Sequence, residues 1–148
     1  EIAEPTAPEA KAHDADGDIA AALKGIRILL VEDNPFNVVV AQEELEDAIE
    51  NVHVEVAENG LIAVEKLRSS AFDVILMDVQ MPTMNGYEAT IAIRAFDNEK
   101  AMTPIIAMTA NVLKDEVDLC YQAGMDDFIG KPFDTLELLH KINLLIKK

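Results

Sequence analysis

Residues 73–78 read Asp-Val-Ile-Leu-Met-Asp, an apolar run of four residues enclosed by two aspartates. An uninterrupted apolar run this short is typical of a strand that is buried on both faces, as in a parallel sheet. Two similar runs occur elsewhere, Ile-Arg-Ile-Leu-Leu-Val at residues 26–31 and Pro-Ile-Ile-Ala-Met at residues 104–108. The sequence therefore predicts three central strands of a sheet whose two faces are both covered.

Segments with helical spacing alternate with these strands and with two further ones. Residues 52–56 alternate apolar and polar side chains, as an edge strand does, and residues 127–129 form a short fifth strand. Helices are expected over about residues 35–49, 59–67, 87–96, 111–123 and 134–148. Strands that alternate with helices of this length predict a doubly wound α/β fold, a five-stranded parallel sheet with five helices on its two faces.

Length and composition favour one domain with an N-terminal extension. The chain has 148 residues, half of them hydrophobic, which is enough for one core. Residues 1–22 are rich in Ala, Glu, Asp and Pro and are expected to form a flexible acidic linker, which leaves residues 23–148 as the domain. The first residue is Glu1 rather than Met, so we expect either a fragment of a longer parent chain or a processed product. No apolar run approaches the length of a membrane span.

The net charge of −16 narrows the classes of partner. It argues against nucleic acid, whose binding needs a basic surface, and against direct contact with an anionic membrane. An acidic chain can still bind a divalent cation or a protein with a basic face. The single cysteine, Cys120, excludes an internal disulfide and fits a reducing compartment, so we expect a cytoplasmic location.

Polar side chains follow four of the predicted strands at the point where each strand ends. Glu32 and Asp33 follow the first strand, Asp78 the third, Thr109 the fourth and Lys131 the fifth. These strand ends meet at one edge of the sheet, where the sites of doubly wound folds form. Three adjacent carboxylates need a cation to stay ionised, and hard oxygen ligands favour Mg²⁺. An aspartate can accept a phosphoryl group, and a metal, a lysine and a hydroxyl can balance its charge. The cluster therefore predicts phosphoryl transfer to an aspartate.

Five motifs surround these strand ends and occur in a fixed order. They read Val31-Glu32-Asp33-Asn34, Met77-Asp78-Val79-Gln80-Met81-Pro82, Asn85-Gly86-Tyr87-Glu88-Ala89, Met108-Thr109-Ala110-Asn111 and Gly124-Met125-Asp126-Asp127-Phe128-Ile129-Gly130-Lys131-Pro132. With this set of motifs, residues 24–148 resemble the receiver (response regulator) family, specifically the receivers of hybrid sensor histidine kinases. The resemblance implies a flavodoxin-like sheet with strand order 2-1-3-4-5.

By this resemblance, Asp78 is the phosphoacceptor, and Thr109 and Lys131 contact the phosphoryl group. The peptide bond between Lys131 and Pro132 is expected to be cis, as in the family. Phe128 lies at the family's aromatic switch position, where a signal from Thr109 remodels the face made by the fourth helix, the fifth strand and the fifth helix. Because Phe128 lacks the hydroxyl of the commoner tyrosine, we expect it to act through packing alone. Ordinary core packing is the alternative role for this residue.

The resemblance also implies a magnesium site. Glu32 and Asp33 would be the acidic pair that positions Mg²⁺, and Asp33 would be the direct ligand of the two. Asp78 and the backbone carbonyl of Gln80 would complete the protein ligands. The first acidic residue is glutamate rather than aspartate, a variation that the family tolerates.

The same resemblance suggests the biological setting. The phosphoryl donor would be a phosphohistidine on a histidine kinase dimerisation domain or on a histidine phosphotransfer protein. The chain shows no histidine box and no ATP-binding pattern, so its own enzymatic status is left open. The parent is expected to be a hybrid sensor histidine kinase anchored in a membrane, with a stand-alone receiver as the alternative.

Three other functions compete with the receiver interpretation. A haloacid dehalogenase type phosphatase needs a second acid two residues after its nucleophile, and Gln80 occupies that position. A flavin or nucleotide site needs clustered glycines, and the six glycines of the chain are too far apart for these motifs. A pseudo-receiver, which keeps the fold as an interaction module without phosphorylation, is disfavoured by the complete acidic site but stays open as the alternative.

Overall fold

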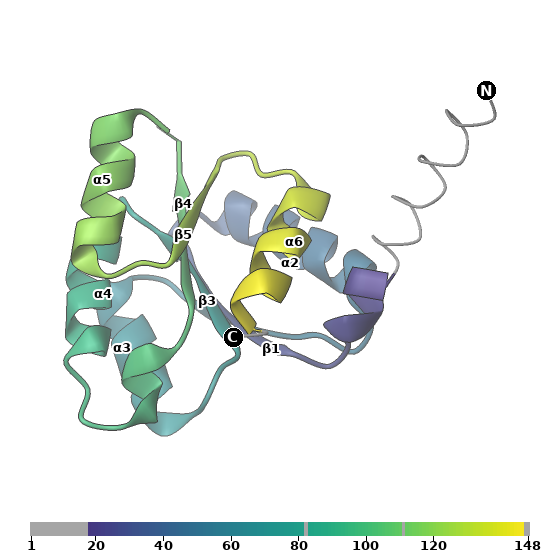
Figure 1. Cartoon of the computed structure of the whole chain (residues 1–148), viewed down its shortest axis with the longest axis horizontal. Coiled ribbons are helices and arrows are strands. Elements are labelled where there is room, and N and C mark those ends of the chain that lie inside the picture. The colour runs from purple at the N-terminus through teal and green to yellow at the C-terminus, as the bar shows by residue number, and fades with distance from the viewer. Residues whose placement is uncertain (1–17, 82, 111, 147–148) are drawn as a thin grey trace.

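The computed structural model describes residues 18–81, 83–110 and 112–146, and its centre is a parallel sheet of five strands (Figure 1). The strands are β1 (Arg27–Val31), β2 (His53–Ala57), β3 (Val74–Asp78), β4 (Ile105–Thr109) and β5 (Asp127–Gly130). They lie in the order β2-β1-β3-β4-β5, so β3 is central. Both the predicted fold class and the expected strand order are confirmed.

Helices cover both faces of this sheet. They are α2 (Pro35–Ala48), α3 (Gly60–Ser69), α4 (Gly86–Arg94), α5 (Lys114–Ala123) and α6 (Thr135–Ile146), with a short 3₁₀ helix η1 (Glu99–Met102). Figure 1 shows α3, α4 and α5 on one side of the sheet and α2 and α6 on the other. These are the five predicted helices. Helix α5 begins three residues later than expected, and Asn111, where its start was placed, lies outside the described residues.

Asparagine caps explain where three of the helices begin. The side chains of Asn34, Asn59 and Asn85 each accept a hydrogen bond from a backbone N–H in the first turn of α2, α3 and α4. Such caps satisfy donors that have no partner inside the helix. At the other end of α5, Gly124 adopts a left-handed conformation with φ 111°, which ends the helix and turns the chain toward β5.

The central strands are buried on both faces, as their apolar runs predicted. Leu29 and Val31 of β1 and Ile75 of β3 pack toward α3, α4 and α5, whereas their neighbours Ile28 and Leu30 pack toward α2 and α6. This alternation gives two apolar cores, one on each side of the sheet. Packing on both faces of the sheet therefore fixes the positions of the polar residues at the strand ends.

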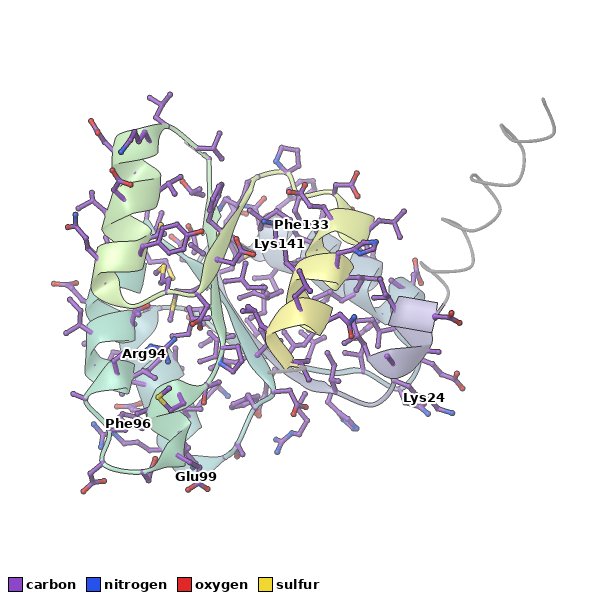
Figure 2. All side chains as sticks on the ribbon, viewed as in Figure 1. Lys24, Arg94, Phe96, Glu99, Phe133 and Lys141 are labelled. Atoms are coloured by element: carbon purple, nitrogen blue, oxygen red, sulfur yellow. The ribbon has the colours of Figure 1, made fainter. Side chains whose placement is uncertain are left out.

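Arg94, at the end of α4, connects the segments that precede β4 and β5 (Figure 2). Its guanidinium donates to the carbonyl oxygens of Ala101, Thr103 and Gly124 at 2.7–2.9 Å and to Asp126 Oδ2 at 2.9 Å. Burial lowers the pKa of Arg94, although the charge of Asp126 opposes this change. Four backbone or carboxylate acceptors around one half-buried cation fix η1, α5 and the start of β5 against α4.

The segment that precedes β1 differs from the expectation. Residues 18–22 are helical, and Ile19 and Ala20 pack against the core beneath α2 and α6, next to the buried Leu23. A flexible linker was expected through residue 22, but apolar residues at 19, 20 and 23 give this turn a side that can be buried. Residues 1–17 of the expected linker lie outside the described residues.

None of the helices in the described part of the chain has the length and apolar character that crossing a membrane requires.

Candidate functional site

An open cleft of about 460 Å³ lies at the carboxyl edge of the sheet. The ends of β1, β3 and β4 and the loop after β5 deliver its polar side chains. It is lined by Glu32, Asp33, Asn34, Pro35, Asn37, Asp78, Val79, Gln80, Thr109, Ala110 and Lys131. Every residue that the sequence singled out for phosphoryl or metal chemistry is therefore in one place.

Three carboxylates form the acidic part of this cleft. Oxygen atoms of Glu32, Asp33 and Asp78 all lie within 4.8 Å of one another. Glu32 and Asp78 are only 3% and 4% exposed, whereas Asp33 is exposed at the mouth of the cleft. Two buried carboxylates beside an accessible one can bind a hard cation that keeps part of its hydration shell.

Lys131 bridges the two buried acids. Its Nζ donates to Glu32 Oε1 at 3.2 Å and to Asp78 Oδ2 at 3.3 Å. Burial alone would lower the pKa of Lys131, but the charges of Asp78 and Glu32 outweigh it and raise that pKa. The ammonium therefore stays charged, and it lies beside the buried carboxylate of Asp78.

The electrostatics of Asp78 reflect its burial. Desolvation, followed by the charge of Glu32, raises the pKa of this carboxyl to about 6, although the Gln80 N–H and Lys131 act in the opposite direction. The Gln80 N–H donates to Asp78 Oδ1 at 3.2 Å. At neutral pH the carboxyl is therefore mostly ionised, which is the form of a carboxylate that can act as a nucleophile.

Thr109 ends β4 on the same edge. Its side chain is buried, and its backbone carbonyl accepts from the Lys131 N–H at 2.8 Å. The peptide bond between Lys131 and Pro132 is cis, the isomer that the family resemblance implied. Thr109 and Lys131 therefore lie next to each other at the ends of two neighbouring strands.

Gly86 is a supporting residue that the sequence analysis did not assign. A Cβ atom at this position would lie 2.4 Å from the Asp78 backbone oxygen and 2.9 Å from Val79 Cα. Only a glycine lets the start of α4 pack so closely against the segment that carries Asp78. The sequence holds one signal, since Gly86 directly follows the capping residue Asn85, but a glycine at the start of a helix does not by itself indicate close packing.

Phe128 lies on β5, at the far side of the sheet from α2. Its half-buried ring makes an edge-on contact with Tyr121 of α5, with centroids 6.3 Å apart. Lys141 of α6 places Nζ 5.2 Å from the centre of the same ring and 3.1 Å from Asp127 Oδ1. One aromatic side chain thus touches residues of both helices that flank β5.

Comparison with known proteins agrees with this geometry. The family model of the response regulator receiver domain matches residues 28–143. The sensor protein GacS of Pseudomonas syringae pv. syringae is 39% identical over 139 residues, which cover 93% of this chain and 15% of GacS. The chain thus spans a small part of that relative.

Two solved structures are informative. The receiver domain of the sensor histidine kinase PA1611 from Pseudomonas aeruginosa PAO1, with a magnesium ion coordinated in its active-site cleft, superposes with a TM-score of 0.76 at 40% identity, covering 84% of this chain and 99% of that one. A second structure contains the receiver domain of Ssk1 of Saccharomyces cerevisiae in complex with the histidine phosphotransfer protein Ypd1. It matches with a TM-score of 0.71 at 27% identity, covering 80% of this chain and 87% of that one.

Proposed function

Because the chain belongs to the response regulator receiver family of two-component phosphorelays, we propose that its Asp78 accepts a phosphoryl group from a phosphohistidine in the presence of Mg²⁺. The observation that carries the proposal is the convergence of Asp78, two further carboxylates and Lys131 in one cleft. Each of these groups has a distinct task in phosphoryl transfer.

Asp78 is the nucleophile. One of its carboxylate oxygens forms a bond to phosphorus while the bond between phosphorus and the donor's imidazole nitrogen breaks, and the nitrogen keeps the electron pair. Lys131 already contacts Asp78 and can turn its ammonium to an oxygen of the arriving group. Thr109, at the end of the neighbouring strand, offers a hydroxyl to another phosphoryl oxygen.

The acidic residues supply the metal site. Asp33 and Asp78, supported by Glu32 and the backbone carbonyl of Gln80, would hold Mg²⁺. When bound, the ion offsets the negative charge of the carboxylates and of the phosphoryl oxygens. Hard oxygen donors within 4.8 Å of one another fit this cation. The magnesium in the cleft of the PA1611 receiver supports the assignment.

The relatives suggest the donor and the parent. GacS is a sensor histidine kinase of which the matched segment is a minor part, which supports a receiver within a hybrid kinase. The complex of Ypd1 with the Ssk1 receiver supports a histidine phosphotransfer protein as a partner. We therefore infer that the donor is either a kinase dimerisation domain or such a phosphotransfer protein.

Phosphorylation would be read out on the face of α5, β5 and α6. Phe128 packs between Tyr121 and Lys141, so a change in its rotamer would disturb both contacts at once. Since Phe128 has no hydroxyl, only packing and the cation–π contact can transmit the change. Phe128 would therefore act as a switch only through its contacts with neighbouring side chains.

The test uses a beryllium fluoride mimic of the phosphoryl group. Amide NMR spectra of the chain should change around Asp78, Thr109 and Lys131 only when Mg²⁺ and the mimic are both present. Asp78→Asn should abolish the change. If the folded wild-type protein shows no response, the proposal fails and the pseudo-receiver alternative takes its place.

A further inference from the structure

Helix α5 is held to the rest of the domain by few buried side chains. Among its ten residues only Cys120 is buried, whereas α3 and α4 each bury four residues. Leu119 and Tyr121 of α5 are 47% and 46% exposed. The carboxyl end of the helix is fixed, because Arg94 Nε donates to the Gly124 carbonyl oxygen at 2.9 Å. The first turns of α5 therefore depend on contacts other than core packing.

Such a contact comes from Tyr87 on the neighbouring helix α4 (Figure 1). The Tyr87 hydroxyl donates a hydrogen bond to Glu116 Oε2 in the first turn of α5. Tyr87 is half-buried, and burial, followed by this hydrogen bond, raises its pKa, so the hydroxyl keeps its proton. The acceptor is a carboxylate, and hydrogen bonds to ionised groups are stronger than those between neutral ones. One strong hydrogen bond thus joins the start of α5 to α4.

The start of α4 is packed tightly against the strand that carries Asp78. The Gly86 N–H donates to the Val79 carbonyl at 3.2 Å, and a Cβ atom at Gly86 would lie 2.4 Å from the Asp78 backbone oxygen. One turn later, the fully buried Thr90 hydroxyl donates to the Gly86 carbonyl at 2.8 Å. Tyr87, which directly follows Gly86, therefore has a fixed backbone position, and α5 is held against it.

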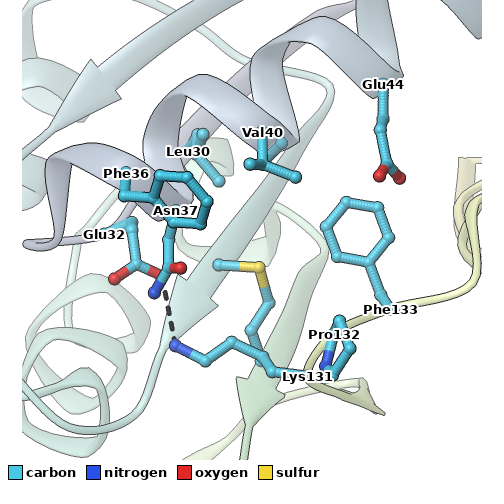
Figure 3. A pocket seen from close by; sticks show the side chains of 11 residues that line it. Leu30, Glu32, Phe36, Asn37, Val40, Glu44, Lys131, Pro132 and Phe133 are labelled. Atoms are coloured by element: carbon cyan, nitrogen blue, oxygen red, sulfur yellow. Dashed lines mark hydrogen bonds and ion pairs between the residues drawn. The ribbon is translucent and has the colours of Figure 1, made fainter.

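The bond between Tyr87 and Glu116 belongs to the arrangement in which Asp78 carries no phosphoryl group. Lys131 Nζ donates to Glu32 Oε1 at 3.2 Å (Figure 3) and to Asp78 Oδ2 at 3.3 Å, so carboxylates of the chain itself bind the ammonium. Thr109 ends β4 five residues before α5 begins. A phosphoryl group that drew the Thr109 hydroxyl toward itself would therefore pull on the segment that leads into α5.

We propose that the hydrogen bond between Tyr87 and Glu116 is a latch that holds the first turn of α5 and breaks when Asp78 is phosphorylated. The inference rests on the proposed function, because the phosphoryl group supplies the pull on Thr109. Helix α5 would then turn about its fixed carboxyl end at Gly124. A helix of ten residues is about 15 Å long, so a rotation of about 10° moves its first turn by about 2–3 Å, which is enough to break a hydrogen bond.

Removing the hydroxyl of Tyr87 tests the latch. Tyr87→Phe keeps the ring and loses only the hydrogen bond, so it should favour the arrangement that the phosphoryl group induces. In NMR titrations of the full chain with Mg²⁺ and beryllium fluoride, half-saturation should need an about tenfold lower concentration of the mimic than in the wild type. Without the mimic, the amides of α5 should exchange with solvent about tenfold faster than in the wild type.

Changes in the first turn of α5 supply matched controls. Glu116→Ala should reproduce the effect of Tyr87→Phe, and the double variant should add little, because both changes remove the same bond. Glu116→Gln keeps an acceptor oxygen and should behave more like the wild type. Asp115→Ala removes an equal charge from an exposed position of the same turn and should change mimic binding by less than about threefold. Thermal melts establish that all variants are folded.

Three outcomes would overturn the inference. They are wild-type mimic binding and exchange in Tyr87→Phe, loss of the α5 response while the cleft amides still respond, and an effect of Asp115→Ala as large as that of Glu116→Ala. The amides of Asp78 and Lys131 report on the proposed function separately. A wild-type cleft that does not respond to the mimic refutes that function, whereas a responding cleft with unchanged behaviour of the latch variants refutes the latch alone.

Discussion

Replacing Asp78 by Asn should stabilise the protein in the absence of metal ions. Asp78 is 4% exposed and lies within the same cleft as Glu32, and its pKa is raised from 3.8 to about 6. A difference of this size corresponds to about 3 kcal/mol that the folded state loses when the group is ionised. Asn has nearly the same shape and no charge, and Lys131 keeps its contact with Glu32. We expect a gain of about 1–3 kcal/mol at about pH 7.5, since the new amide will be imperfectly hydrogen-bonded.

The pH dependence of this gain follows from the direction of the pKa change. Because the pKa of Asp78 is raised in the folded state, the carboxyl is more often protonated in the folded state than in the unfolded state between pH 3.8 and about 6. The cost of ionisation is therefore complete above about pH 6, shrinks as the pH falls, and is absent below 3.8. The stability difference between Asp78→Asn and wild type should be largest at neutral pH and should vanish near pH 4.

Urea unfolding in the presence of EDTA measures this difference directly. Asp33→Asn is the matched control, because it removes one negative charge from the exposed mouth of the same cleft, and it should change the stability by less than about 0.5 kcal/mol. Added Mg²⁺ should narrow the gap by stabilising the wild type. An Asp78→Asn protein that is no more stable than wild type at neutral pH, or whose advantage persists at pH 4, would refute the reasoning.

Three other changes test the structure around the site. Gly86→Ala should lower the free energy of unfolding by about 2 kcal/mol or more, because the new Cβ would lie 2.4 Å from the Asp78 backbone oxygen. Urea unfolding should show a lower midpoint, and an unchanged midpoint would contradict the close packing. Arg94→Met should cost about 2–4 kcal/mol in urea unfolding because it leaves partly buried acceptors unpaired. Arg68→Met, which removes a contact with the Phe96 ring, should cost less than about 1 kcal/mol, and equal costs for the two variants would argue against the Arg94 network. Lys131→Met should raise the pKa of Asp78 further, since Lys131 lowers it, and carboxyl ¹³C NMR should show the titration moved to higher pH rather than lower.

Much of this fold could be predicted from local patterns because each pattern has a direct physical cause. The apolar run ending at Asp78 is a strand covered on both faces, and α2 begins at residue 35 as expected, with Asn34 as its cap. The strand-end residues converge because parallel strands bring their carboxyl ends to one edge. Once the strands are known, the topology alone therefore brings the distant residues of the site together.

What the sequence did not reveal depends on contacts between distant side chains. The hydroxyl of Tyr87 on α4 donates to Glu116 on α5, and Arg94 reaches the carbonyl of Gly124, yet no periodic signal links these positions. The helical turn at residues 18–22 was also missed, because a few small and apolar residues in an acidic segment give a weak pattern that only packing against the core makes stable.

The central claim is that Asp78 accepts a phosphoryl group, and the most direct measurement is intact mass spectrometry after incubation with acetyl phosphate. With Mg²⁺ present, the wild-type chain should gain the mass of one phosphoryl group, and the gain should disappear with EDTA and in Asp78→Asn. Labelling that persists in Asp78→Asn, or a folded wild-type chain that stays unlabelled with Mg²⁺, would contradict the account.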